Sequence, residues 1–416
     1  MGARLKTKTY NKQTMNISKW TQVLLGAGLI TLPAVAQAAE LETPSLLTAV
    51  SSTTLSGYID TSAVWKVGTG NANMPGRVYD GADTQDGFNL NVVSLTLTKP
   101  LDEGEWSAGY NVQMLLGPWA TKRGTRSIIG SGGDLAMNEA VILLRAPVGN
   151  GIDFKVGQFG TYNGYEAFDT YKNPNWSRSY GFYIESSAHT GISASYKFND
   201  MFSAMVGVGN IAGFNNQADA KSSIESRKAY LGILTFTAPG SFGAMSGATL
   251  SAGYTYGDAV PAGGTNGFNN VSGIPNPDGR WSQGNFYVGG AIPLPVSGLS
   301  LGFAYDYTHG YLFEESYAEA AALYLSWQIT EKMKLNTRAD YAWGSNGTFG
   351  YMTSDGEKNE LLSLTGTLDY ALWKNVISRA EVRWDTALSG DRPFGGKVDP
   401  TDRNAVSLAL NFIYQF

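Results

Sequence analysis

Residues 406–416 form the sequence Val-Ser-Leu-Ala-Leu-Asn-Phe-Ile-Tyr-Gln-Phe. Every second residue, from Val406 to Phe416, is large and apolar, and most of the residues between them are small or polar. Successive side chains of a β-strand point to opposite faces. The stretch therefore predicts a strand with one apolar face and one mostly polar face.

The cost of exposing this strand to water indicates where it lies. A long aromatic edge strand is an aggregation hazard in water, so an ordinary edge of a soluble sheet is the weaker interpretation. The stretch resembles the C-terminal recognition strand of bacterial outer-membrane proteins, which the barrel-insertion machinery binds. We therefore expect Phe416 to mediate contact with that machinery and the apolar face to contact outer-membrane lipid.

The same alternation recurs along the chain, for example over 299–307, 333–343 and 376–385. An apolar face is the core of a soluble sheet, but it is the lipid-facing surface of a membrane barrel. The number and spacing of the strands favour the barrel. We predict sixteen strands, at 55–66, 89–99, 105–116, 137–147, 151–159, 190–199, 202–211, 226–237, 247–257, 283–294, 298–309, 317–330, 332–344, 358–371, 374–386 and 402–416.

The connections between these strands alternate between short and long. Short periplasmic turns and long extracellular loops are typical of bacterial barrels. The predicted fold class is thus all-β, a closed antiparallel transmembrane β-barrel of about 16 strands. Aromatic residues also gather at the two ends of the strands, as they do at both membrane interfaces. They are Trp65, Tyr256, Tyr307, Trp343 and Trp384 at one end, and Trp327, Tyr370, Tyr414 and Phe416 at the other.

The N-terminal residues resemble a secretory signal. Basic residues precede an apolar stretch at 23–35, and Ala36-Gln37-Ala38 matches a cleavage site. A membrane anchor is the alternative, but the apolar stretch is too short to span a bilayer. We predict a signal peptide at 1–38, a periplasmic segment at 39–54 and a barrel at 55–416, with Met15 as a second candidate start. The predicted location is the outer membrane.

Composition excludes several classes of function. The chain has no cysteine, so it has neither disulfides nor thiolate metal sites. Removal of the five basic residues within 1–38 changes the formal net charge from −5 to −10. Such a charge disfavours nucleic acid as a partner. It favours cations as solutes, although net charge does not locate the charges.

A more specific pattern covers residues 156–198. It contains Val156-Gly157-Gln158-Phe159, Gly164-Tyr165-Glu166, Ser177-Arg178-Ser179-Tyr180 and His189-Thr190-Gly191. The pattern resembles the OmpL-like family of β-barrel porins, as does the Arg379–Asp385 run. The resemblance extends from about residue 55 to the end of the chain and implies porin activity. The solute is not indicated.

Charged residues at alternate positions of the late strands are the main candidate pore lining. A charge facing lipid near the membrane midplane costs about 2–4 kcal/mol for arginine, so these residues must face water inside the barrel. They either solvate the wall by pairing with one another or orient solutes. The predicted pore-lining residues are Asp306, Arg338, Asp340, Arg379, Glu381, Arg383 and Asp385.

The loop at 160–189 is the candidate constriction. An outer loop can fold into a wide barrel and narrow it; the alternative is a loop packed over the mouth. The predicted constriction residues are Glu166, Asp169, Lys172 and Arg178, and the acids are expected to face basic residues of the wall.

Catalysis and metal binding have little support. Gly298-Leu299-Ser300-Leu301-Gly302 matches a nucleophile elbow but lies in a predicted strand, where that motif does not function. Asp80, Asp83 and Asp86 lack calcium-loop spacing, so a solvated loop is expected. We predict no enzyme activity, cofactor or metal.

The function expected is therefore a porin for passive diffusion of small hydrophilic solutes or ions. A structural or adhesive barrel with a plugged lumen is the alternative, followed by a barrel enzyme. The oligomeric state is open, and a homotrimer is one option.

Overall fold

The computed structural model describes residues 52–68, 70–84, 86–122, 134–212, 226–258, 282–312 and 314–416. Sixteen strands form within them. They are β1 (Thr54–Val67), β2 (Gly87–Lys99), β3 (Ser107–Leu116), β4 (Leu135–Ala146), β5 (Ile152–Gly160), β6 (Ala188–Lys197), β7 (Phe202–Gly209), β8 (Ala229–Thr237), β9 (Thr249–Asp258), β10 (Ser282–Pro293), β11 (Leu299–His309), β12 (Tyr317–Gln328), β13 (Met333–Gly344), β14 (Asn359–Tyr370), β15 (Val376–Ala387) and β16 (Asn404–Gln415).

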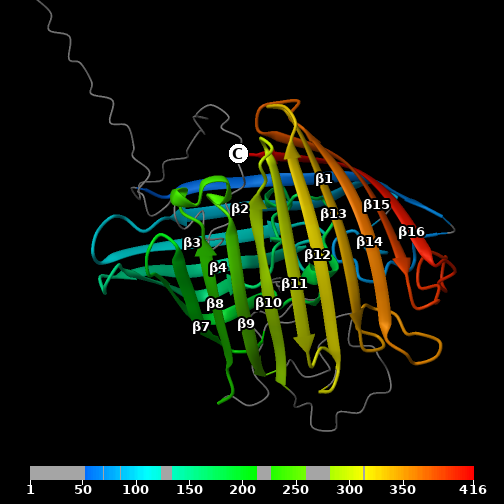
Figure 1. Ribbon diagram of the computed structural model, residues 1–416, viewed down its shortest axis with the longest axis horizontal. Coiled ribbons are helices and arrows are strands. Elements are labelled where there is room, and N and C mark those ends of the chain that lie inside the picture. Colours follow the sequence, from blue (N-terminus) through cyan, green and yellow to red (C-terminus); the bar gives the residue numbers. More distant parts are fainter. Residues whose placement is uncertain are drawn as a thin grey trace, which may run out of the picture.

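The strands close into one antiparallel barrel. Each strand pairs with its neighbours in sequence, and β1 pairs with β16 to complete the ring. Figure 1 shows this wall, with β7 to β16 side by side at the front and β1 to β3 running behind. The sixteen-strand prediction is confirmed, and each predicted strand end lies within three residues of the observed one. Within the described residues, no helix has the length and apolar character needed to cross a membrane.

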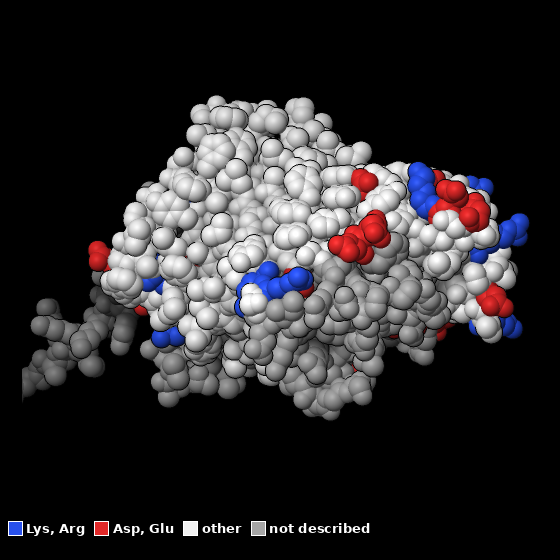
Figure 2. Space-filling view, turned by 90° about the horizontal axis from the view of Figure 1, so that it is seen from below, with Lys and Arg blue, Asp and Glu red and all other residues white. Residues whose placement is uncertain are grey.

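The outer face of the barrel is apolar. On β16, Leu408, Leu410 and Phe412 are each 40–42% exposed, whereas Ala409 and Asn411 between them are buried. On the face drawn in Figure 2, uncharged side chains cover most of the described surface, and charged ones gather in a few clusters, several at one end. The alternation predicted from the sequence therefore separates an apolar outer surface from a polar interior.

The connections differ between the two ends of the barrel. Short turns such as 198–201 lie at one end, which we call the turn end, and longer loops lie at the other, the loop end. The first loop, L1, is residues 68–86, and the third, L3, is residues 161–187. The predicted signal peptide at 1–38 lies outside the described residues, as do residues 39–51 of the segment predicted to precede the barrel.

L3 lies inside the barrel. It contains the 3₁₀ helix η1 (Thr170–Lys172) and the short helix α2 (Tyr180–Ile184), which contacts β11, β12 and β13. In Figure 1, this green segment is seen behind these strands, within the ring. Residues 175–186 are all buried, so the second half of L3 fills the space beside this part of the wall.

Candidate functional site

The inner face of β13, β14 and β15 carries charge in rows across the strands. The strand register places Arg338 level with Arg383 in one row, and Asp340 level with Asp385 in the next. Thr365 separates the two arginines, and a serine separates the two aspartates. Alternation along each strand thus turns a charged sequence into a basic row beside an acidic row, both pointing inward.

The arginines of this wall bind the main chain of L3. Arg379 donates from its two terminal nitrogens to the carbonyl oxygens of Thr170 and Asn173, both at 2.9 Å. Arg383 donates to the carbonyl oxygen of Arg178 at 2.5 Å. A buried carbonyl without a partner is costly, so these bonds stabilise a loop that has few main-chain partners of its own.

The acids of the wall accept the main-chain N–H groups of the same loop. Glu381 accepts from the amides of Trp176 at 2.6 Å and Ser177 at 3.0 Å. Asp340 accepts from the amide of Tyr180 at 3.0 Å, and Asp385 accepts from the hydroxyl of the same residue at 2.6 Å. The basic side chains of the wall therefore donate to carbonyl groups of the loop backbone, and the acidic side chains accept from its amides.

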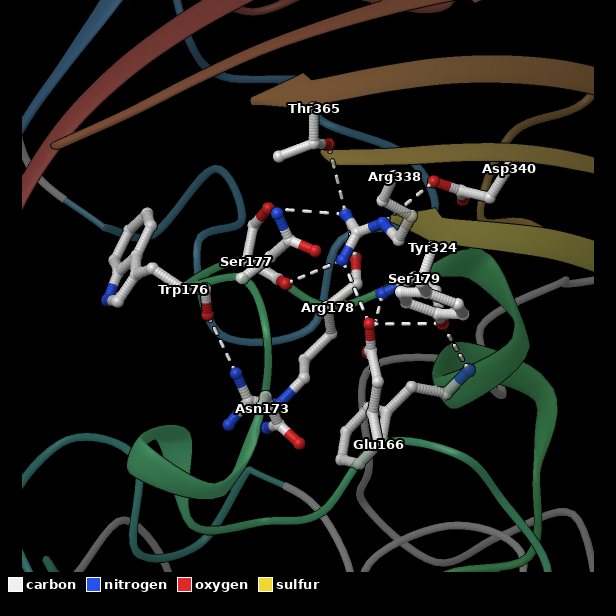
Figure 3. A network of polar contacts seen from close by, with 12 residues as sticks. Glu166, Asn173, Trp176, Ser177, Arg178, Ser179, Tyr324, Arg338, Asp340 and Thr365 are labelled. Carbon is white, nitrogen blue, oxygen red and sulfur yellow. Dashed lines mark hydrogen bonds and ion pairs between the residues drawn. The ribbon is translucent and has the colours of Figure 1, made fainter. Parts of the chain in front are cut away.

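One buried ion pair joins a side chain of the loop to the wall. Arg338 Nη1 lies 2.9 Å from Glu166 Oε1, and Arg338 Nε lies 3.0 Å from Asp340 Oδ2. Arg338 also donates to the carbonyl oxygen of Ser177 at 2.8 Å and to the hydroxyl of Thr365. Figure 3 shows the guanidinium between these groups, with L3 on one side and the strands on the other.

Local sequence explains how L3 reaches this position. Ser179 caps α2 by accepting a bond from the amide of Phe182, and Glu166 accepts the amide of Ser179 at 2.8 Å. These acceptors satisfy amides that the first turn of a helix leaves without partners. Gly164 has a φ of 117°, which only glycine adopts readily, and a Cβ there would lie 2.3 Å from Glu185 Oε2.

All seven predicted pore-lining residues point inward, and L3 covers the region where they lie. Their exposed fractions are 6% or less. Asp306 on β11 also lies against L3, because a Cβ on Gly181 of α2 would lie 2.8 Å from its carboxylate. The structure thus brings L3 against these side chains, and their role in a pore stays a prediction.

The four predicted constriction residues take different places within L3. Glu166, Asp169 and Arg178 are buried, and Lys172 keeps 21% of its side chain exposed. Arg178 donates to the carbonyl oxygens of Phe168 at 2.6 Å and Trp176 at 2.7 Å, so it stabilises the fold of L3 itself. Their effect on ion flow is likewise a prediction.

A second charged pair lies on β4 and β5, away from the rows of β13 to β15. Glu139 on β4 and Lys155 on β5 form an ion pair of 3.0 Å, with 20% and 31% of their side chains exposed. Lys172 and Asp169 of L3 form a pair of 2.7 Å. We call these four residues the charged gap. Glu139 and Lys155 were not predicted, although each lies at an inward position of its strand.

Electrostatics fixes the protonation of the loop pair. Burial raises the pKa of Asp169, but Lys172 and hydrogen bonds from Tyr58 and Gln113 outweigh it and lower the pKa below its ordinary 3.8. Burial lowers the pKa of Lys172, but the attraction of Asp169 outweighs it and raises the pKa above its ordinary 10.5. Both residues are therefore charged at neutral pH.

L1 also reaches into the barrel. Arg77 is buried and pairs with Asp80 of its own loop and with Asp385 of β15. Tyr79 packs on Trp119, with ring centroids 4.8 Å apart. The expectation of a solvated first loop is wrong for Asp80, which is 2% exposed because Arg77 draws it onto the wall.

The motifs considered for catalysis do not assemble. Ser300 lies within β11 and pairs in register with Ser326, so no strand-to-helix turn follows it. Asp306 faces inward, whereas His309 on the same strand bonds Tyr254 at 3.0 Å on the other face. Within the described residues, no three histidine or acidic side chains are grouped as a metal site would require.

Comparisons with known proteins agree on one class. Residues 52–416 match the family described as "Putative beta-barrel porin-2, OmpL-like". A search of curated proteins finds no match.

Solved structures with the same fold include three outer-membrane proteins. The outer membrane channel DcaP of Acinetobacter baumannii is 14% identical, with a TM-score of 0.52, over 88% of this chain and 97% of that one. An anion-selective porin from Comamonas acidovorans is 12% identical, with a TM-score of 0.56, over 88% and 99%. OprB of Pseudomonas putida is 11% identical, with a TM-score of 0.57, over 88% and 94%. At these identities the likeness concerns the fold.

Proposed function

The chain belongs to the OmpL-like family of β-barrel porins, and from this premise we propose that it forms a water-filled channel for passive diffusion of small hydrophilic solutes or ions. The observation that carries the proposal is the charged gap. Four charged side chains lie in the interior of an outer-membrane barrel, and Lys155 and Lys172 stay partly exposed there. Partly exposed charge inside a barrel requires water beside it.

The proposed path runs between L3 and the part of the wall formed by β4 and β5, where Glu139 and Lys155 lie. L3 contacts the strands on either side, β3 through Asp169 and Gln113 and β6 through Tyr162 and Ser193. In the first half of L3, buried residues such as Asn163, Glu166 and Asp169 alternate with partly exposed ones such as Tyr162 and Tyr171. The partly exposed side faces the path, and the other side is held by the wall. L3 is then the constriction, and its second half closes the space beside β12 to β15.

Export and assembly complete the proposal. We propose that residues 1–38 direct secretion, that 39–54 lead into the barrel, and that Phe416 is the contact for the barrel-insertion machinery. Lipid covers the apolar outer face. A homotrimer is compatible with the barrel, and a solved OmpT of Vibrio cholerae with this fold is described in a trimer form.

A conductance measurement tests the channel against the two alternative functions. A plugged structural or adhesive barrel would show no conductance, and an enzyme would need a catalytic set that the described residues do not assemble. We would measure single-channel conductance of the purified full-length protein in planar bilayers. Discrete steps are expected, and their complete absence would favour the plugged barrel.

The absence of native cysteine allows a direct test of the path. Lys172→Cys, treated with a bulky thiol reagent, should lower the conductance. Lys358→Cys is the matched control, because this lysine lies beyond the loop end of β13, with half of its side chain exposed, and pairs with Glu360 on β14. An equal response of the two variants would argue against a path beside L3.

A further inference from the structure

In both ion pairs of the charged gap, the lysine side chain is more exposed to solvent than the acidic side chain. Lys155 is 31% exposed against 20% for Glu139, and Lys172 is 21% exposed against 8% for Asp169. The order is the same on the wall and on L3. A solute beside these pairs therefore meets more of the lysine side chains than of the acidic ones.

The carboxylate of Asp169 has little capacity left for a solute. Its Oδ1 accepts from the hydroxyl of Tyr58 at 2.9 Å and from the amide of Gln113 at 3.1 Å, and its Oδ2 faces Lys172. An ammonium group carries three donors, so one carboxylate partner leaves donors for an anion. The carboxylate of Asp169 is thus engaged by groups of the protein, whereas the ammonium group of Lys172 still has donors for a solute.

The two lysines act on the same space. Lys155 Nζ lies 5.9 Å from the ring centroid of Tyr162 in L3, the loop that carries Lys172, and like charges on adjacent elements repel each other. An anion between the lysines relieves that repulsion, whereas a cation adds to it. At physiological ionic strength the Debye length is about 8 Å, so more distant charges of the chain contribute less than these four.

The neighbouring charges toward the turn end do not reverse this balance. Arg145 and Asp153 form a bidentate pair, with Nε to Oδ1 at 2.6 Å and Nη2 to Oδ2 at 2.7 Å. Their side chains are 19% and 23% exposed, which is nearly balanced. The two charges of this pair cancel and are about equally exposed, so the pair favours neither sign of solute. The unequal exposure of cation and anion is a property of the charged gap.

We infer that the charged gap makes the channel prefer anions, with chloride and small carboxylates as the solute class. The inference rests on the proposed function as a channel and adds the sign of the solute. It opposes the expectation from the formal net charge of −10 without residues 1–38, because the nearest and most exposed groups determine selectivity at a constriction.

The test is the reversal potential of the full-length protein in a planar bilayer under a KCl gradient. The two ions have similar mobility, so the potential reports the pore. We expect the chloride-to-potassium permeability ratio to exceed one. Lys155→Gln with Lys172→Gln should lower that ratio by about threefold or more, because two positive charges are lost from the charged gap.

Two further variants keep the result interpretable. Lys155→Arg with Lys172→Arg should retain the ratio, and Lys358→Gln should leave it unchanged because this lysine is not part of the gap. Barrel formation of each variant is checked by heat-modifiable gel mobility. If the glutamine pair does not fold, the single variant Glu139→Gln should raise the ratio instead.

The outcomes separate the two proposals. Absence of conductance in the wild-type protein would overturn the channel function. Conductance with a ratio of one or less would overturn the anion preference and leave the channel intact. A ratio above one that none of the gap variants changes would also overturn the inference, since another region would then be selective.

Discussion

Arg338 on β13 and Glu166 in L3 join the barrel wall to the loop inside it, with 2.9 Å between Nη1 and Oε1 and both side chains almost fully buried. They are 172 residues apart in sequence. All three nitrogens of the guanidinium donate, to Glu166, Asp340, Thr365 and the main chain of L3. Arg338 is therefore one of several wall residues that hold L3 in position, together with Arg379, Glu381 and Arg383.

Replacing Arg338 should release L3. In Arg338→Met, Glu166 and Asp340 remain as buried carboxylates without their partner, and removing one member of a buried pair costs about 3–5 kcal/mol. We expect a lower urea midpoint and frequent closing steps in single-channel traces. Lys358→Met, at a half-exposed ion pair, is the control and should change the midpoint little. Equal effects of the two substitutions would exclude the anchor.

The strands were predictable from sequence because each carries its own period-two pattern. β16 and β13 are examples, since alternation alone assigns Leu410 to lipid and Arg338 to the interior. The partner of Arg338 was predictable only in kind. Sequence indicated that acids of L3 face basic residues of the wall, but the register of the strands and the path of L3 decide which acid meets which base. Asp169 and Lys172 of the charged gap were predicted, but Glu139 and Lys155 were not, because alternation gives the direction of a side chain and not the group that it meets.

A substitution at Gly302 on β11 tests whether steric fit, and not only charge, holds L3 against the wall. A Cβ there would lie 2.1 Å from the hydroxyl of Tyr165, which stacks on Tyr324 at 4.2 Å. Gly302→Ala should displace this ring, loosen L3 and increase open-channel noise. Gly366→Ala is the matched control, because its Cβ would meet only a methyl group of Val382 at 3.8 Å. A quiet channel in Gly302→Ala would mean that Tyr165 does not position the loop.

Asp385 should hold L1 as well as L3, since Arg77, Tyr180 and Arg383 all contact its carboxylate. Asp385→Asn removes the charge that retains Arg77, so we expect trypsin to cleave after Arg77 faster in the folded barrel. Proteolysis follows the population of open loops. Asp391→Asn provides the comparison, because Asp391 bonds Ser354 in another loop. Unchanged cleavage in Asp385→Asn would show that L1 is held elsewhere.

Acid should act on the charged gap through Asp169. Its pKa is lowered below 3.8, so the stability it contributes is present above that value and is lost as pH falls through the folded-state pKa. Protonation also frees Lys172. We therefore expect the chloride-to-potassium ratio to rise and the urea midpoint to fall below pH 3.8. Asp169→Asn should show the raised ratio already at neutral pH; an acid response identical to wild type in this variant would assign the effect to another group.

The C-terminal strand gives the last prediction, which separates main-chain closure from side-chain recognition. Phe416 and Gly57 exchange two main-chain bonds of 2.9 and 3.0 Å, which extend the seam between β1 and β16. Deleting Phe416 removes both bonds and the ring, whereas Phe416→Ala removes only the ring.

If the insertion machinery binds the terminal aromatic side chain, both variants should lower the amount of assembled barrel in the membrane by a similar factor. If closure of the ring is what matters, the deletion should be clearly worse. Phe412→Ala is the control for loss of one lipid-facing ring, since Phe412 lies on the same face of β16 and is 40% exposed. Heat-modifiable mobility of outer-membrane fractions measures the folded amount. Normal levels in both Phe416 variants would exclude a role for this residue in assembly, whatever the resemblance of the strand to a recognition signal.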